Sequence, residues 1–153
     1  MTMQARSPIA DNYDLPYDVT VDENLNITFK RIPLVHKMFL ERYGDTTRSY
    51  EVFSNGLSNG LFRDYSYIGT IDPKVMIQLT DLIKDCNVNA WNGFKHPDPE
   101  LEDKIFYGEA EGEFFNLSIE FDDDSTIEAS GCNEFPENYK LFMRKLDELL
   151  SDY

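Results

Sequence analysis

The stretch from Phe114 to Ala129 constrains the fold more than any other part of this chain of 153 residues. In "FFNLSIEF" apolar and polar side chains alternate, which predicts a strand with one buried face, formed by Phe115, Leu117, Ile119 and Phe121. The run Asp122-Asp123-Asp124-Ser125 predicts a turn, and "TIEAS" then continues the apolar face with Ile127 and Ala129. A hairpin with one apolar face needs a second layer to cover that face.

Two amphipathic segments can supply this layer. In residues 72–86, Asp72 can cap a helix, Pro73 suits its first position, and Asn87 is a plausible left-handed stop. In residues 136–150, five apolar side chains form one stripe: Tyr139, Phe142, Leu146, Leu149 and Leu150. Burying these five would contribute roughly 7–15 kcal/mol before entropy is subtracted, so we expect this helix to dock on the sheet.

We therefore predict a single α+β domain over residues 25–153. Its antiparallel sheet has about five or six strands, and the two helices pack on one face. The core is predicted to contain Leu79, Ile83, Phe115, Leu117, Ile119, Ile127, Phe142 and Leu146.

The remaining segments give weaker patterns. Residues 1–24 are polar and lack periodicity, which predicts an arm that is either mobile or laid over the domain. Residues 26–32 alternate like a strand. Residues 33–43 have helical spacing between Pro33 and Gly44, which favours a short helix, although a buried strand could carry the same run. Residues 87–104 read as an irregular loop, and residues 105–112 as a strand that pairs with the next one.

The hexapeptide "NGLSNG" at residues 55–60 contains the pattern G-x-S-x-G of a hydrolase nucleophile elbow. An elbow needs a helix after the serine, whereas "LFRDYSYI" follows here with a strand pattern. Asn-Gly occurs twice, and this dipeptide is favoured in hairpin turns. We therefore interpret the hexapeptide as a turn between two strands and Ser58 as non-catalytic.

The net charge of −15 comes from 29 acidic and 14 basic residues. Such a surface repels nucleic acid and anionic lipid, and no apolar run is long enough for a membrane span. Because the N-terminus also lacks the apolar region of a signal peptide, we expect a cytoplasmic protein.

The acidity is uneven along the chain. Residues 97–124 hold eleven acids and one base, Lys104. If they fold as a loop and a hairpin, one side of the molecule is strongly negative and can speed encounter with a basic partner. The alternative is that these acids only keep the chain soluble.

The sequence contains no strong motif for catalysis, metal binding or cofactor binding. Cys86 and Cys132 are not in a C-x-x-C pair, and His36 and His96 each stand alone. The three consecutive aspartates lack the glycine and glutamate of a calcium loop. We predict no metal, no cofactor and no catalytic residue. The rival hypothesis is a small hydrolase-like enzyme that uses scattered carboxylates or Cys132, whose thiol pKa a following helix could lower.

Two loops hold the candidate binding residues. Residues 90–94 contain the only tryptophan, and residues 131–136 lead into the last helix. Loop aromatics usually fill a gap beneath the loop, but they also anchor binding surfaces. The candidates are Trp91, Phe94, His96, Asn133 and Glu134.

The segments "WNGF" and "IEASGCNEFPENYKLF" resemble a family of small uncharacterised bacterial proteins. That family shares a Trp-x-Gly-Phe loop and an Ala-Ser-Gly-x-Asn-x-Phe-Pro-x-x-Tyr segment before the last helix. The resemblance covers residues 65–150 and implies no activity. The acidic and aromatic surface leads us to expect a non-enzymatic binding module for a basic protein partner. Charge and size favour one version, an immunity-type role that masks a basic toxin surface. The sequence leaves the oligomeric state open.

Overall fold

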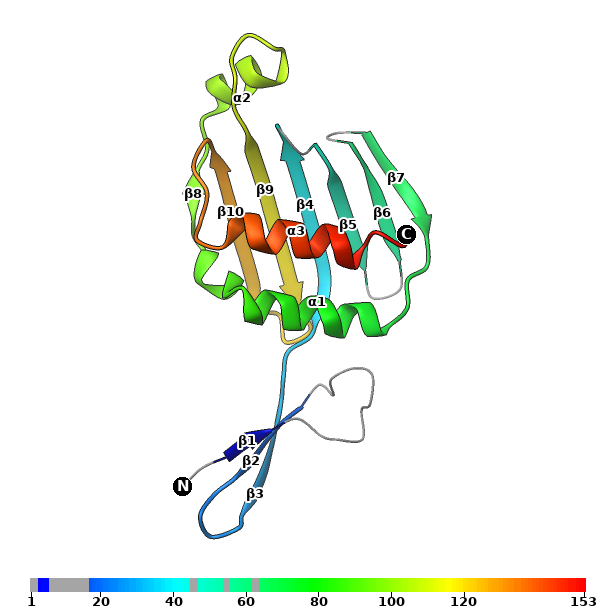
Figure 1. Cartoon of the computed structure of the whole chain (residues 1–153), viewed down its shortest axis with the longest axis vertical. Helices are drawn as coiled ribbons and strands as arrows, with labels where there is room; N and C mark the ends of the chain where they lie inside the picture. The colour runs from blue at the N-terminus through cyan, green and yellow to red at the C-terminus, as the bar shows by residue number, and fades with distance from the viewer. Residues whose placement is uncertain (1–2, 6–16, 45–46, 54–55, 62–63) are drawn as a thin grey trace.

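A seven-stranded sheet with two helices across one face forms the main body of the protein (Figure 1). The computed structural model describes residues 3–5, 17–44, 47–53, 56–61 and 64–153. The strands follow the order β7-β6-β5-β4-β9-β10-β8. Their bounds are β4 (Val35–Tyr43), β5 (Ser49–Phe53), β6 (Leu57–Leu61), β7 (Asp64–Gly69), β8 (Lys95–His96), β9 (Phe114–Phe121) and β10 (Thr126–Cys132).

This architecture confirms the α+β class and corrects the predicted sheet. The sheet has seven strands rather than five or six, and β8 pairs with β10 in parallel. The parallel strand forms because the chain after Trp91 is tied to β10. The Gly93 N–H donates to the Glu128 carbonyl at 3.0 Å, and the Ser130 N–H donates to the Phe94 carbonyl at 2.8 Å.

Helices α1 (Lys74–Asp85) and α3 (Tyr139–Leu149) cover the sheet, as predicted (Figure 1). Asn87 has the left-handed conformation expected after α1, with φ of 55°. The predicted hairpin is also confirmed, since β9 and β10 pair antiparallel on either side of the turn at residues 122–125. All the predicted core residues are buried: Leu79, Ile83, Phe115, Leu117, Ile119, Ile127, Phe142 and Leu146.

The predicted helix at residues 33–43 is wrong, and the buried-strand alternative is right. Residues Val35–Tyr43 form β4, which pairs with β5 on one side and β9 on the other. Met38 and Leu40 are both fully buried, at 0% exposure. Two neighbouring strands satisfy the backbone of β4, and this pairing outweighs the helical spacing of its apolar residues.

The predicted turn at residues 55–60 is too long, because most of the hexapeptide is a strand. Residues Leu57–Leu61 are strand β6, and β7 follows as another strand, so the segment holds three strands where two were predicted. Asn55 lies outside the described residues. Ser58 lies within β6, opposite Glu51 of β5 and Tyr67 of β7. A serine in the middle of a strand does not have the strand-to-helix corner of a nucleophile elbow.

The predicted loop at residues 87–104 contains regular structure. It includes a 3₁₀ turn, η1 (Val88–Trp91), strand β8 and helix α2 (Pro99–Phe106). The predicted strand at 105–112 is wrong, because its first residues end α2 and no strand follows before Phe114. Asp98 stabilises the start of α2, since its carboxylate accepts from the Leu101 N–H at 3.1 Å.

A separate three-stranded antiparallel sheet precedes the main body. It contains β1 (Met3–Ala5), β2 (Tyr17–Val21) and β3 (Ile27–Arg31). Strand β3 confirms the predicted strand at 26–32, and β1 and β2 fall in the segment expected as an arm. The connection to β4 is tied to the main body, because the Leu34 N–H donates to Asp122 Oδ1 at 3.1 Å.

Candidate functional site

The acidic stretch 97–124 is divided between the two ends of the main sheet. Seven acids and Lys104 lie in residues 98–113, on α2 and the loop that follows it. We call residues 98–113 the acidic end. The Asp122–Asp124 turn lies at the other end of β9, roughly 26 Å away at about 3.3 Å per strand residue (Figure 1). The expectation that this stretch makes one negative side is therefore corrected.

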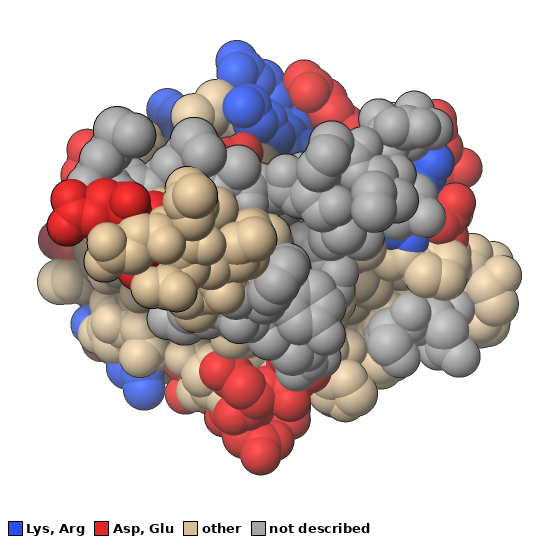
Figure 2. Space-filling model, turned by 90° about the horizontal axis from the view of Figure 1, so that it is seen from below, with Lys and Arg blue, Asp and Glu red and all other residues tan. Residues whose placement is uncertain are grey.

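Charges also separate elsewhere on the surface. Seen from the end that carries the small sheet, the largest basic patch and the largest acidic patch lie on opposite edges (Figure 2). On this face, basic and acidic side chains thus gather at separate edges (Figure 2).

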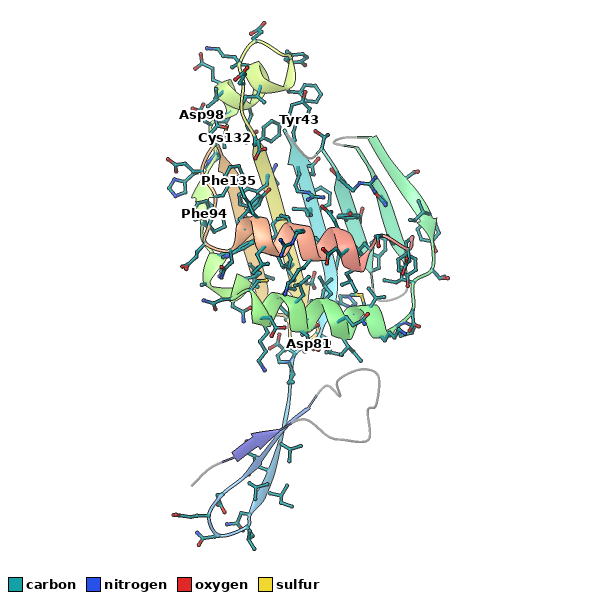
Figure 3. All side chains as sticks on the ribbon, viewed as in Figure 1. Tyr43, Asp81, Phe94, Asp98, Cys132 and Phe135 are labelled. Carbon is teal, nitrogen blue, oxygen red and sulfur yellow. The ribbon has the colours of Figure 1, made fainter. Side chains whose placement is uncertain are left out.

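A small apolar cluster fastens the acidic end to the sheet. Its buried members are Ile105, Phe114 and Cys132. The Tyr43 ring stacks on Phe114 with centroids 5.4 Å apart and lies 5.3 Å from the Phe106 ring (Figure 3). The Tyr43 hydroxyl also donates to the Phe106 carbonyl at 3.3 Å. Helix α2 thus has a fixed position although it is only 8 residues long.

Asn133 fixes the loop between α2 and β9. Its side-chain oxygen accepts from the Glu113 N–H at 2.8 Å, and its own N–H donates to the Glu113 carbonyl at 2.8 Å. Asn133 has φ of 57°, a left-handed conformation that asparagine tolerates well. At Gly112, with φ of 154°, a β-carbon would collide with the Asn133 amide. Asn133, predicted as a binding residue, therefore positions the acidic end.

An open cavity of about 650 Å³ lies beside this loop. Its lining combines apolar surface with two carboxylates, and comprises Tyr43, Gly44, Ile105, Ala110, Glu111, Gly112 and Glu113. Gly44 permits the close approach of the two chain segments, since a β-carbon there would meet the Glu113 side chain. Apolar walls beside carboxylates and a tyrosine ring suit a lysine or arginine side chain, which has an aliphatic stem and a cationic head.

Three of the predicted binding residues come together at β8. His96 Nδ1 lies 2.7 Å from Glu134 Oε2, and the rings of Phe94 and His96 are 4.5 Å apart. Phe94 and Phe135 lie on the same side of the molecule, next to β10 (Figure 3). The His96–Glu134 contact is exposed on both sides, and such pairs contribute little to stability.

Trp91 is a core residue rather than a surface contact. It is 3% exposed, its ring meets Phe142 edge-on at 5.4 Å, and its Nε1–H donates to the Glu137 carbonyl at 2.9 Å. The indole thus fills the space beneath the start of α3, which is the usual role of a loop tryptophan.

Cys132 lacks the environment of a nucleophile. It is 6% exposed and packs with Ile105 and Phe114. Burial raises the pKa of its thiol, and the carboxylates of Glu102 and Asp98 raise this pKa further. The hypothesis of a lowered pKa is wrong because nearby acids and burial both disfavour the thiolate.

Among the described residues, no group of three His, Cys, Asp or Glu residues could hold a metal ion. Within the same residues, no helix is both long enough and apolar enough to cross a membrane.

The sequence analysis did not predict the residues around the cavity to be a binding site. A local pattern does predict α2: Asp98 precedes Pro99, and the apolar Leu101 and Ile105 follow four residues apart. No local signal marked Tyr43, because its partner rings lie far along the chain. Comparisons with protein-family models, curated proteins and solved structures give no match. The resemblance to a bacterial family stays a prediction.

Proposed function

We propose that the chain is a non-enzymatic cytoplasmic binding module whose acidic end contacts a basic protein partner. One observation carries the proposal. The carboxylates of Asp103, Glu109 and Glu111 are exposed and make no ion pair or hydrogen bond with any described residue. Like charges on one short segment repel one another without stabilising the fold, so a partner of opposite charge would relieve this repulsion.

The chemistry of the partner follows from the surroundings of these acids. A lysine or arginine side chain can enter the 650 Å³ cavity, where Tyr43 offers a ring and Glu111 and Glu113 offer carboxylates. Tyr107, which is 71% exposed, adds an aromatic side chain beside the acids. Tyrosine is enriched among the residues that dominate binding energy at protein interfaces.

An immunity-type role is one concrete form of this proposal. A small acidic protein could bind the basic surface of a toxin and prevent that surface from reaching its target. Small size and negative charge support this version. In the cytoplasm, the buried thiols of Cys86 and Cys132 would remain reduced.

Capture of partners from the lysate of the native organism, followed by mass spectrometry, tests the proposal. We expect a basic protein to be retained at about 20 mM salt and released near 300 mM, because exposed charges are screened. The variant Asp103→Asn/Glu109→Gln/Glu111→Gln should no longer retain this basic protein. A control that removes the same charge from α1, α3 and the C-terminal segment, Asp85→Asn/Glu148→Gln/Asp152→Asn, should still bind it. Equal retention by the two variants would contradict the role of the acidic end, and so would failure to capture any basic protein.

A further inference from the structure

We propose that a second pocket, between α3 and the adjoining ends of β4 and β9, binds an organic anion that carries a carboxylate on an apolar, ring-sized body. The inference goes beyond the basic-partner proposal and does not depend on it. The pocket has a volume of about 320 Å³, at the lower end of the range for small-molecule sites. It is lined by cationic, apolar and acidic side chains.

Asp147, the first of the two acids that line the pocket, already accepts hydrogen bonds from other residues. Asp147 accepts from both terminal nitrogens of Arg42, at 3.1 Å and 2.7 Å, and from the Tyr50 hydroxyl at 2.8 Å. Arg42 is 3% exposed, whereas the Asp147 side chain is 35% exposed, so the pair is partly buried. With three donors on its two oxygens, Asp147 has little capacity left for the cations of α3. Glu113 is the other acid of the lining; it and Tyr43 also line the cavity beside the acidic end, so the two cavities adjoin.

The pocket also has two cations that pair with nothing in the described chain. Lys140 and Arg144 lie four residues apart on α3, and both line the pocket. Neither side chain makes an ion pair or a hydrogen bond with any described residue. Like charges at this spacing weaken a helix, so their arrangement does not serve the stability of α3. In a chain with a net charge of −15, unpaired neighbouring cations point to an anionic ligand.

The rest of the lining favours an apolar body attached to the anion. Met143 lies between the two cations in sequence and is buried, and Tyr139 adds an aromatic ring. Burial raises the pKa of the Tyr139 phenol, which therefore stays protonated and able to donate a hydrogen bond. A carboxylate can accept from a guanidinium and an ammonium at once, while a flat ring covers the apolar wall. Inorganic phosphate would satisfy the cations but leave that wall in water.

Titration calorimetry on the full chain with 2-naphthylacetate tests this inference. Two matched ligands separate charge from ring: the uncharged 2-naphthylacetamide and inorganic phosphate. We expect 2-naphthylacetate to bind, and each of the other two to bind at least about tenfold more weakly. The variant Lys140→Gln/Arg144→Gln should bind 2-naphthylacetate at least about tenfold more weakly than the unaltered protein. The control Lys95→Gln/Lys145→Gln, with the same change in net charge, should leave the affinity unchanged.

Several results would overturn the inference. They are absence of binding by 2-naphthylacetate at millimolar concentration, phosphate affinity equal to that of 2-naphthylacetate, and undiminished affinity in Lys140→Gln/Arg144→Gln. If the double variant does not fold, amide chemical shifts of the unaltered protein decide the question. Added 2-naphthylacetate should move the signals of residues 139–147, and changes confined to other parts of the chain would also overturn the inference.

Discussion

Acidic side chains have different roles in two regions of this protein. At the junction of α3 with the sheet, Asp147 accepts from Arg42 and from the Tyr50 hydroxyl. At the acidic end, Asp103, Glu109 and Glu111 are exposed and have no such partners among the described residues. The first region uses an acid to join a helix to a sheet, and the second presents acids to solvent.

The difference shows that burial and partners, rather than residue type, determine what an acid contributes. A carboxylate that is partly removed from water needs donors, and its loss or theirs is costly. An exposed carboxylate keeps its water and contributes little to folding, so it remains available to a binding partner. Four predictions test this contrast, in order of decreasing effect on stability.

Arg42→Met should produce the largest effect. It removes both Arg42 donors from Asp147 and, among the described residues, leaves the Tyr50 hydroxyl; we expect a loss of about 2–4 kcal/mol in the free energy of unfolding. Urea unfolding measures this loss. Arg144→Met on the exposed side of α3 is the control and should cost less than about 0.5 kcal/mol. Similar losses in the two variants would show that the Arg42–Asp147 pair does not join α3 to the sheet.

Asn133→Ala should cost about 1–3 kcal/mol, because it removes the acceptor for the Glu113 N–H and places alanine at a φ of 57°. Asn133→Gly separates these causes, since glycine adopts this conformation without strain. We expect Asn133→Gly to lose less stability than Asn133→Ala in the same urea experiment. Equal stability of both variants and the unaltered protein would show that Asn133 does not hold the acidic end.

Tyr50 should make the junction sensitive to alkaline pH. Burial, followed by the hydrogen bond to Asp147, raises its pKa to about 12 from the ordinary value of 10.0. Because the folded state keeps the proton more tightly, this stabilisation is complete below pH 10 and is lost as the pH rises through 12. We expect the free energy of unfolding to fall by about 1–2 kcal/mol more in the unaltered protein than in Tyr50→Phe over this interval. Parallel pH profiles would contradict the assignment.

The triple variant Asp103→Asn/Glu109→Gln/Glu111→Gln should have the smallest effect. Its free energy of unfolding should change by less than about 0.5 kcal/mol, since these carboxylates contact no side chain or backbone donor in the described part of the chain. Relief of repulsion should make any change a gain. A loss comparable to that of Arg42→Met would remove the contrast between the two regions.

Local pattern was sufficient for the elements that bury one clear face. The alternation of Phe115 and Leu117 predicted β9, and the stripes that contain Leu79 and Phe142 predicted α1 and α3. For these segments, the periodicity of the apolar residues matches the periodicity of the backbone, so that one conformation buries them all.

Prediction from the local sequence failed where contacts with distant parts of the chain determined the secondary structure. Residues 35–43 have helical spacing, yet β5 and β9 bind both edges of this segment and make it a central strand. Residues 105–112 look like a strand, yet the Asp98 cap and the packing of Ile105 keep the first of them in α2. In both cases tertiary contacts outweighed a weak local preference.

The chain's own residues thus fixed the α+β class, the main helices, the hairpin and the excess of acid, because these depend on periodicity and composition. Folding determined which acids are held and which are free, because that depends on contacts between residues far apart in the chain. Asp147 meets Arg42 across 105 positions, and Glu113 meets Asn133 across 20. Loop closure over such distances is decided by the packing of the whole domain and leaves no local trace in the sequence.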